Sequence, residues 1–321
     1  MQHDEQPPPQ TAPHGRVISH LGETDTDDAT LLASIKTRLR QHNDRSAAEM
    51  EHLLQLVDAL WAMELGRFLL RNRGLNAYWT HQLVTYQAGT LVQQTTPALE
   101  YELFEKAPAV LATRERFGIF RTQLQALLRP GMTLASLPCG WMGDVLSLDY
   151  GQCPDVRLIG IDLDPQALDG ALRLAQHYGL EGQLTLQRED AWAPGEPNSV
   201  DVLTSNGLNL YEPDDARVIA LYRAFFDRLR PGGTLVASFL TPPPSLCAES
   251  PWKLDLIDGA ALVLQSQVFI DVVQARWASF RTHAQTRTQL ESAGFADVRF
   301  IDDRASIFPT VIARKPMATE M

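Results

Sequence analysis

Short apolar runs alternate with amphipathic runs along the second half of the chain. An apolar run of four to eight residues bounded by glycine, proline or polar clusters is typical of a strand that is buried on both faces. Such runs cover residues 133–137, 156–161, 184–187, 199–204 and 234–240. Because helical periodicity fills the segments between them, the pattern predicts an α/β fold with a doubly wound parallel sheet.

Two more strand-like runs, 296–301 and 307–313, lie close together near the end of the chain. The segment between them is too short for a crossover connection, so the two strands should be antiparallel. We therefore expect a mainly parallel, seven-stranded, Rossmann-like sheet whose last strand is antiparallel.

Helical periodicity dominates the region before the sheet. Predicted helices cover 29–40 and 46–73, and two more start near Asn76 and Pro108. Residues 29–129 are thus expected to form an N-terminal helical cap subdomain. Residues 1–28 are rich in proline and acidic side chains, which predicts a disordered tail. The remainder, 130–321, would be the sheet domain, with an insertion at about 242–282 that includes a helix over 259–280.

Composition narrows the classes of function. A length of 321 residues with 45% apolar content is enough for a sizeable core. The net charge of −11 argues against general nucleic-acid binding, which needs clustered Lys and Arg. Three cysteines without a CxxC pair indicate neither a disulfide framework nor a metal site. No run is long and apolar enough for a membrane span or a signal-peptide core, so a cytoplasmic location without membrane association is expected.

A glycine turn joins the first two predicted strands of the sheet. Gly140 lies in the segment 138–143, and Asp162 ends the next strand about 20 residues further on. Glycine lets the backbone approach a ligand closely, and an acidic side chain at this place can accept hydrogen bonds from ribose hydroxyls. This combination predicts an adenosine site, with a simple backbone turn as the alternative role of the glycine.

Five segments together resemble the class I S-adenosylmethionine-dependent methyltransferases. They are SLPCGWMGDVL, LIGIDLDPQAL, REDAW, SVDVLTSNGLNLY and LRPGGTLVASF, in the expected order within residues 130–315. The resemblance implies S-adenosylmethionine as the cofactor and a small-molecule substrate as the methyl acceptor.

The resemblance also implies a set of cofactor-binding residues. They are Pro138 and Gly140 at the first turn, Asp162 and Leu163 at the ribose, Asp190 and Ala191 at the adenine, and Asn206 and Gly207 on the floor of the site. Simpler roles stay open for some of them. Asp190 could cap a turn and Asn206 could satisfy a local backbone group, while Asp164 is expected only to cap the helix that follows Pro165.

The first turn departs from the family pattern. Ser136, Pro138 and Met142 occupy the positions where such families carry an acidic residue and two glycines. Gly140 alone remains in register. How the methionine end of the cofactor is held is therefore left open.

No catalytic triad, metal helix or phosphate loop is found, and a methyl sulfonium needs alignment and exclusion of water more than it needs an acid. His81, His177 and His283 are isolated in sequence and are expected at surface or satisfied positions. A general base stays unassigned. Candidates for the acceptor side, each with packing as the alternative role, are Tyr78, Tyr211 and Trp252. The acceptor itself is expected between the helical subdomain and the insertion.

Two other functions are compatible with this sequence. On the same fold, S-adenosylmethionine can be the substrate of an intramolecular cyclisation, as in the azetidine-2-carboxylate synthases, with release of methylthioadenosine. The chain could also be a non-catalytic nucleoside-binding or scaffold protein, since the first turn has lost glycines. A nicotinamide dehydrogenase fits less well because the G-x-G-x-x-G pattern is missing.

Overall fold

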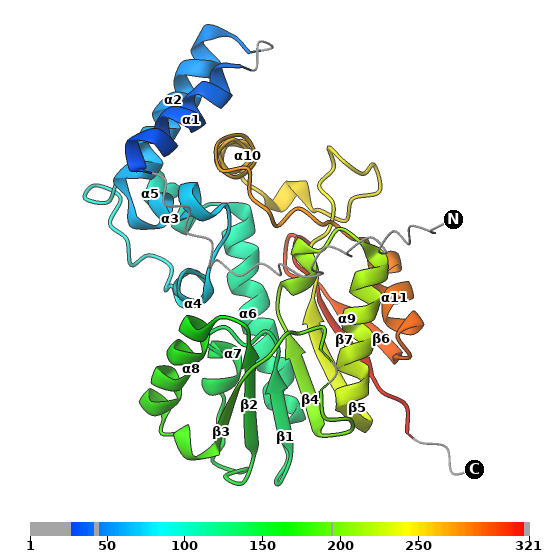
Figure 1. Cartoon of the computed structure of the whole chain (residues 1–321). Coiled ribbons are helices and arrows are strands. Elements are labelled where there is room, and N and C mark those ends of the chain that lie inside the picture. Colours follow the sequence, from blue (N-terminus) through cyan, green and yellow to red (C-terminus); the bar gives the residue numbers. More distant parts are fainter. Residues whose placement is uncertain (1–26, 42–44, 194, 318–321) are drawn as a thin grey trace, which may run out of the picture.

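A seven-stranded sheet forms the centre of the computed structural model, which describes residues 27–41, 45–193 and 195–317 (Figure 1). The strands are β1 (Thr133–Ser136), β2 (Arg157–Asp162), β3 (Leu184–Arg188), β4 (Val200–Ser205), β5 (Leu229–Ser238), β6 (Ala296–Ile301) and β7 (Thr310–Arg314). Their order is β3-β2-β1-β4-β5-β7-β6, and β7 is antiparallel to both of its neighbours. This confirms the predicted fold. Most of the predicted tail, 1–28, lies outside the described residues.

Helices cover both faces of this sheet, because alternate side chains of its buried strands point to opposite sides. Leu134 and Val202 pack on one side with Phe120 and Leu124, whereas Ala135 and its neighbours pack on the other. The first side carries α6 (Pro108–Leu127), α7 (Gly143–Leu146) and α8 (Pro165–Tyr178). The second carries α9 (Asp215–Arg228) and α11 (His283–Ser292).

In the described part of the chain, five shorter helices precede α6. They are α1 (Asp28–Arg40), α2 (Ala47–Ala62), α3 (Glu64–Asn72), α4 (Ala77–Thr85) and α5 (Ala98–Glu105). Asp27 accepts a hydrogen bond from the backbone of Thr30, and Asn76 accepts one from Trp79, so both act as N-caps. Helix α6 packs on the sheet through Phe120 and Leu124, so it connects the two parts of the chain. The domain boundary near residue 129 stays a prediction.

Four predicted boundaries were wrong, and one of them is the start of β7, which is Thr310 and not Ile307. The helix expected over 46–73 is interrupted at Met63, whose backbone is extended, and Gly66 then lies against the backbone of Leu60 with no room for a Cβ. The helix expected over 259–280 is shorter. It comprises α10 (Gly259–Ser266) and a π-helical segment η4 (Gln267–Val272), and it ends where Gln274 adopts a positive φ. The fourth error concerns β5, which includes 231–233 because Leu229 already pairs with Val200.

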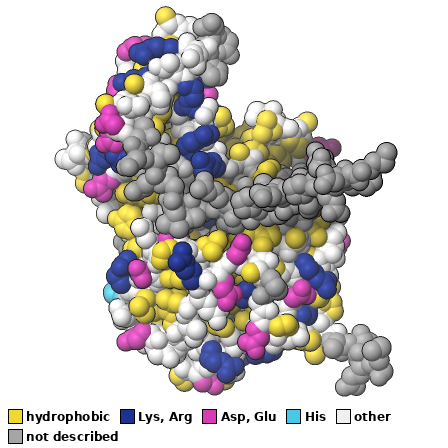
Figure 2. Space-filling view, in the orientation of Figure 1, with side chains coloured by type: hydrophobic (Ala, Val, Ile, Leu, Met, Phe, Trp, Pro, Cys, Tyr) yellow, Lys and Arg dark blue, Asp and Glu magenta, His cyan; other side chains and the backbone are white. Residues whose placement is uncertain are grey.

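The insertion packs against the N-terminal helices. Val268, Val272 and Val273 share a core with Val57 and Leu60 of α2, and an ion pair of 2.7 Å joins Arg45 to Asp271. The sheet, the N-terminal helices and the insertion therefore surround a common space at the carboxyl ends of the strands. On the face shown in Figure 2, acidic and basic side chains are interspersed, so opposite charges lie near one another.

Candidate active site

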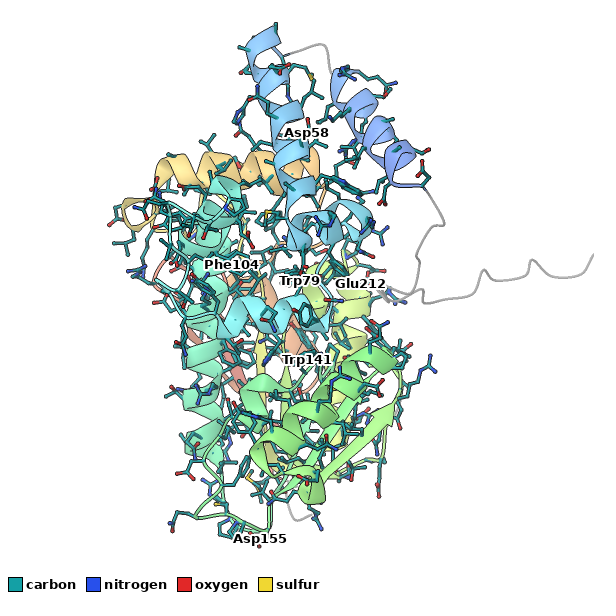
Figure 3. The ribbon with its side chains drawn as sticks, turned by 90° about the vertical axis from the view of Figure 1, so that its left-hand side faces the viewer. Asp58, Trp79, Phe104, Trp141, Asp155 and Glu212 are labelled. Carbon is teal, nitrogen blue, oxygen red and sulfur yellow. The ribbon has the colours of Figure 1, made fainter. Side chains whose placement is uncertain are left out.

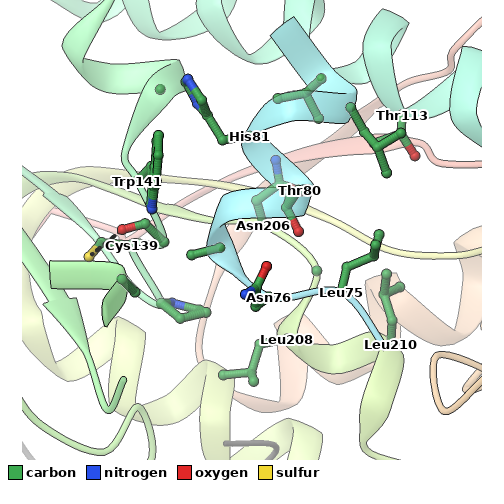
Figure 4. Close-up of a pocket in the computed structure, with 18 of the residues that line it drawn as sticks. Leu75, Asn76, Thr80, His81, Thr113, Cys139, Trp141, Asn206, Leu208 and Leu210 are labelled. Atoms are coloured by element: carbon green, nitrogen blue, oxygen red, sulfur yellow. Dashed lines mark hydrogen bonds between the residues drawn. The ribbon is translucent and has the colours of Figure 1, made fainter. Parts of the chain in front are cut away.

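A cavity of about 290 Å³ lies at the carboxyl ends of β1, β2 and β4, below α4 (Figure 4). One part of its wall comes from the turns after these strands, and the other part comes from α3, α4, α5, α6 and the segment around η4. Ligands of open α/β sheets bind in this crevice, beyond the carboxyl ends of the strands. The location therefore matches that of a cofactor and substrate site.

Most of the residues predicted to bind the cofactor lie on the wall of this cavity. They are Pro138, Gly140, Asp162, Leu163, Ala191, Asn206 and Gly207. Asp190 is not on this wall, although its neighbours Glu189 and Ala191 are. Its carboxylate accepts a hydrogen bond of 3.0 Å from the backbone of Trp192, as a turn cap does. Asp164 lines the cavity and also caps α8 through Gln166.

The carboxylate of Asp162 is held by the backbone on both sides. The N–H of Gly140 donates to Oδ2 at 2.9 Å, and the N–H of Asp164 donates to Oδ1 at 3.0 Å. Burial raises the pKa of Asp162, and these two hydrogen bonds oppose the rise. Because each carboxylate oxygen has two lone pairs, each can accept one further hydrogen bond. Asp162 is thus oriented and still able to bind a diol.

Met142 shows how the first turn forms without its usual glycines. Its φ of 54° is in the left-handed region, which a methionine seldom adopts. The side chain is almost fully buried, and its sulfur lies 2.5 Å from the place where a Cβ on Gly160 of β2 would be. The absence of a side chain at Gly160 therefore makes room for the methionine, which also contributes to the cavity wall.

Two charged residues that the sequence analysis did not single out lie on the cavity wall. Arg116 of α6 and Asp144 of α7 are 5% and 8% exposed. Arg116 lies one turn from Ala112 and Phe120, both buried, so its position on an apolar helix face was a signal available in the sequence. Asp144 accepts a hydrogen bond of 3.3 Å from the hydroxyl of Thr204.

Burial shifts the pKa values of both Arg116 and Asp144. Burial lowers the pKa of Arg116 to about 10, against the opposing effect of Asp303 and Asp144, so it stays charged at neutral pH. Burial also raises the pKa of Asp144. One guanidinium nitrogen of Arg116 is 3.5 Å from the hydroxyl of Ser238, and the guanidinium carbon is 4.9 Å from the ring centre of Phe308.

An aromatic pair closes the side of the cavity next to α4. The rings of His81 and Trp141 are 4.9 Å apart with an interplanar angle of 34°, and both residues line the cavity (Figure 4). Figure 3 shows Trp141 just below α4, where the N-terminal helices meet the sheet. Burial lowers the pKa of His81, which favours the neutral imidazole. The structure thus brings His81 to the site, whereas His177 and His283 lie elsewhere.

The three aromatic candidates for the acceptor side have different positions. Tyr211 lines the cavity, and burial raises its pKa to about 12 against the opposing effect of the Leu75 backbone. Tyr78 is 40% exposed and lies outside the cavity wall, with its ring at the edge of Trp141. Trp252 is also outside and donates to the hydroxyl of Thr241 at 2.9 Å.

Other chemistries find little support in the part of the chain that the structure describes. No group of three or more His, Cys, Asp or Glu side chains in it could hold a metal ion. Cys139 lines the cavity, but it is buried and its pKa is raised, which keeps it a thiol. None of the described helices combines the length and apolar character of a membrane span.

Comparison with solved structures shows which known fold this chain shares. The CurJ carbon methyltransferase is 15% identical, with a TM-score of 0.50 over 88% of this chain and 70% of that one, which shows a common fold. The fold is therefore class I methyltransferase-like. A possible exported protein from Bordetella parapertussis is 55% identical, with a TM-score of 0.85 over 90% of this chain and 95% of that one. No family model and no curated protein matches the sequence. At this identity and coverage, the chain belongs to the same family as the Bordetella parapertussis protein.

Proposed function

We propose that the chain is an S-adenosylmethionine-dependent enzyme that transfers a methyl group to a small-molecule acceptor. The observation that carries this proposal is the carboxylate of Asp162, which is fixed by Gly140 and Asp164 at the cavity wall and keeps lone pairs for a ribose diol. In this proposal the turn around Gly140 lies beside the nucleoside, and Ala191 contacts the adenine. S-adenosylmethionine, when bound, supplies an electrophilic methyl group.

The rest of the cavity suggests what the acceptor is like. Beyond the turns of the sheet, the wall is largely apolar and includes Leu65, Leu69, Leu103, Phe269 and Trp277. These side chains come from α3, α5 and the region of the insertion. An acceptor with an apolar body would fit between them, since apolar burial is the main source of affinity in such pockets.

Few catalytic groups are needed for this reaction. The N-terminal helices cover the site and exclude water, and the walls hold the acceptor in line with the methyl group. His81 would accept a proton from an acceptor hydroxyl or amine, because its lowered pKa keeps the imidazole neutral at pH 7. Tyr211 is a poor base, because its phenol stays protonated at that pH.

Cyclisation of S-adenosylmethionine is a second candidate, and the position of Asp144 favours it. An amine must lose its proton before it can act as a nucleophile. A buried carboxylate with a raised pKa, on the cavity wall, is suited to accept that proton. The apolar extension of the cavity favours transfer instead, since cyclisation needs no second substrate.

Product analysis separates the two candidates. The purified full chain would be incubated with S-adenosylmethionine alone, and then with a panel of apolar phenols, amines and carboxylic acids. Methyl transfer predicts S-adenosylhomocysteine only in the presence of an acceptor, whereas cyclisation predicts methylthioadenosine without one. If calorimetry detects no binding of S-adenosylmethionine or S-adenosylhomocysteine, the proposed function is wrong.

A further inference from the structure

Arg116 is a buried cation with unused hydrogen-bonding capacity. Its guanidinium has one long contact, 3.5 Å, to the hydroxyl of Ser238, and its buried Nε has no hydrogen-bond partner among the described residues. Arg281, which is equally buried, contacts Asp215 and the carbonyl oxygens of Asn209 and Glu212. A buried charge is costly unless it is paired, so Arg116 lacks an anionic partner that Arg281 has within the chain.

Neighbouring carboxylates do not fill this role. Asp303 accepts hydrogen bonds from the backbone N–H groups of Ala305, Ile307 and Phe308, at 3.1, 3.2 and 2.6 Å. Asp144 accepts a hydrogen bond from the hydroxyl of Thr204, and its charge raises the pKa of Arg116. The cavity wall therefore carries Arg116 and Asp144, whose charges act on each other, and neither Asp303 nor Asp144 forms an ion pair with the guanidinium among the described residues.

The position of this pair relative to Asp162 fits one ligand that reaches both. Asp162 ends β2, Asp144 is tied to Thr204 of β4, and only β1 lies between these strands. With strands about 4.8 Å apart, the two places are roughly 10 Å from each other. The bonds from the ribose of S-adenosylmethionine to its amino-acid group can cover such a distance.

We infer that Arg116 and Asp144 form a binding site for the α-amino and carboxylate groups of an amino acid, in a role that rests on the proposed function. Arg116 would take the carboxylate and Asp144 the ammonium group. A simple anion would be repelled by Asp144 and a simple cation by Arg116, whereas a zwitterion has both charges on neighbouring atoms. The ligand is either the methionine end of the cofactor or a free amino acid used as the second substrate.

This site would also account for the altered first turn. Ser136, Pro138 and Met142 replace an acid and two glycines near the methionine end. In this protein, side chains of α6 and α7 would bind the amino-acid group that the backbone of a glycine-rich turn could otherwise bind.

Calorimetry with matched nucleosides tests the inference. S-adenosylhomocysteine carries the amino-acid group and methylthioadenosine lacks it. Both would be titrated into the full chain and into Arg116→Gln, Arg116→Lys and Asp144→Asn. Arg281→Gln is the matched control, because it removes a buried arginine outside the cavity wall. Retained binding of methylthioadenosine shows that a variant is folded.

If the cofactor is the ligand, the unaltered chain prefers S-adenosylhomocysteine, and Arg116→Gln lowers that preference by about 10- to 100-fold. Arg116→Lys should lose less, and Arg281→Gln should leave the preference unchanged. If a free amino acid is the ligand, the nucleoside preference stays constant. A panel of L-amino acids, added with S-adenosylhomocysteine, then binds to the unaltered chain and not to Arg116→Gln.

Two outcomes overturn the inference. If each nucleoside and each amino acid binds to Arg116→Gln as tightly as it binds to the unaltered chain, Arg116 and Asp144 have only a structural role. The proposed function then survives. If neither nucleoside binds to the unaltered chain, the proposed function falls and this inference falls with it.

Discussion

The two ends of the cavity are built in different ways. At the end that the proposed function assigns to the ribose, the carboxylate of Asp162 is held by backbone N–H groups from its own strand end and from the adjacent turn. At the other end, Arg116 and Asp144 come from separate helices and meet β4 and β5 through the side chains of Thr204 and Ser238. The donors at the first end are backbone groups, so only the acceptor, Asp162, depends on the identity of a side chain. The second end depends on particular residues and can set specificity.

The largest effect on nucleoside affinity, and the strongest test of the difference between the two ends of the cavity, is expected at Asp162. The change Asp162→Ala removes one or two charge-assisted hydrogen bonds to the nucleoside, at roughly 1.5–3 kcal/mol each, or about 10- to 100-fold per bond. It should weaken methylthioadenosine and S-adenosylhomocysteine alike, unlike Arg116→Gln. Calorimetry measures both affinities. Asp214→Ala, which removes an exposed helix cap outside the cavity wall, should change neither; unchanged affinity in folded Asp162→Ala would exclude the ribose role.

A second test concerns the contact between the indole ring of Trp141 and Gly170 of α8. A Cβ on Gly170 would overlap the indole ring of Trp141. Gly170→Ala should therefore displace the ring and lower the free energy of unfolding by about 1–3 kcal/mol, as overpacking does. Thermal or urea unfolding measures the loss. Gly182→Ala is the control, because a Cβ there meets no atom within 4 Å. Equal stability of the two variants would show that Trp141 is free to move.

A third test concerns the tie between the N-terminal helices and the loop after β4. Tyr211→Phe removes a buried phenol oxygen whose pKa the Leu75 backbone lowers, and it should lower the free energy of unfolding by about 1 kcal/mol. Product formation, measured at saturating cofactor, should persist, since Tyr211 is assigned no proton transfer. Tyr178→Phe, at a surface position, should have no effect on stability. Loss of turnover with unchanged stability in Tyr211→Phe would instead give the phenol a direct role in the reaction.

The smallest effect expected is a pH dependence at the ribose end. Because the pKa of Asp162 is raised above 3.8 in the folded chain, nucleoside affinity should fall as the pH drops through this raised value. The stability of the free protein has the opposite sign. The folded state binds the extra proton in this window, so this contribution to stability is present at low pH and is lost as the pH rises through the folded pKa. Titrations of Asp162→Asn should lack both effects.

The sequence predicted the sheet and the places of Gly140 and Asp162 beside the cavity because both follow from local patterns. Apolar runs specify buried strands, and Gly140 and Asp162 stand at fixed places relative to two of them. The other end could not be predicted in the same way. Arg116 lies within α6, before the first strand of the sheet. Its contact with Ser238 joins residues that are far apart in the chain.

Helix boundaries show the same limit. Apolar periodicity continues through Met63, but the break there arises from the close approach of Gly66 to Leu60. That approach is a property of packing between neighbouring helices, which periodicity does not contain. Likewise, His81 carries no motif, and only the fold brings it against Trp141.

The packing of Met142 above Gly160 couples the residues that these two positions accept. A Cβ at 160 would lie 2.5 Å from the sulfur of Met142 and 2.7 Å from the side chain of Leu186, and a glycine at 142 would leave an unfilled hole over β2. Either change made alone is therefore expected to destabilise the chain. A glycine-rich turn can be engineered here only together with substitutions that refill the space over β2.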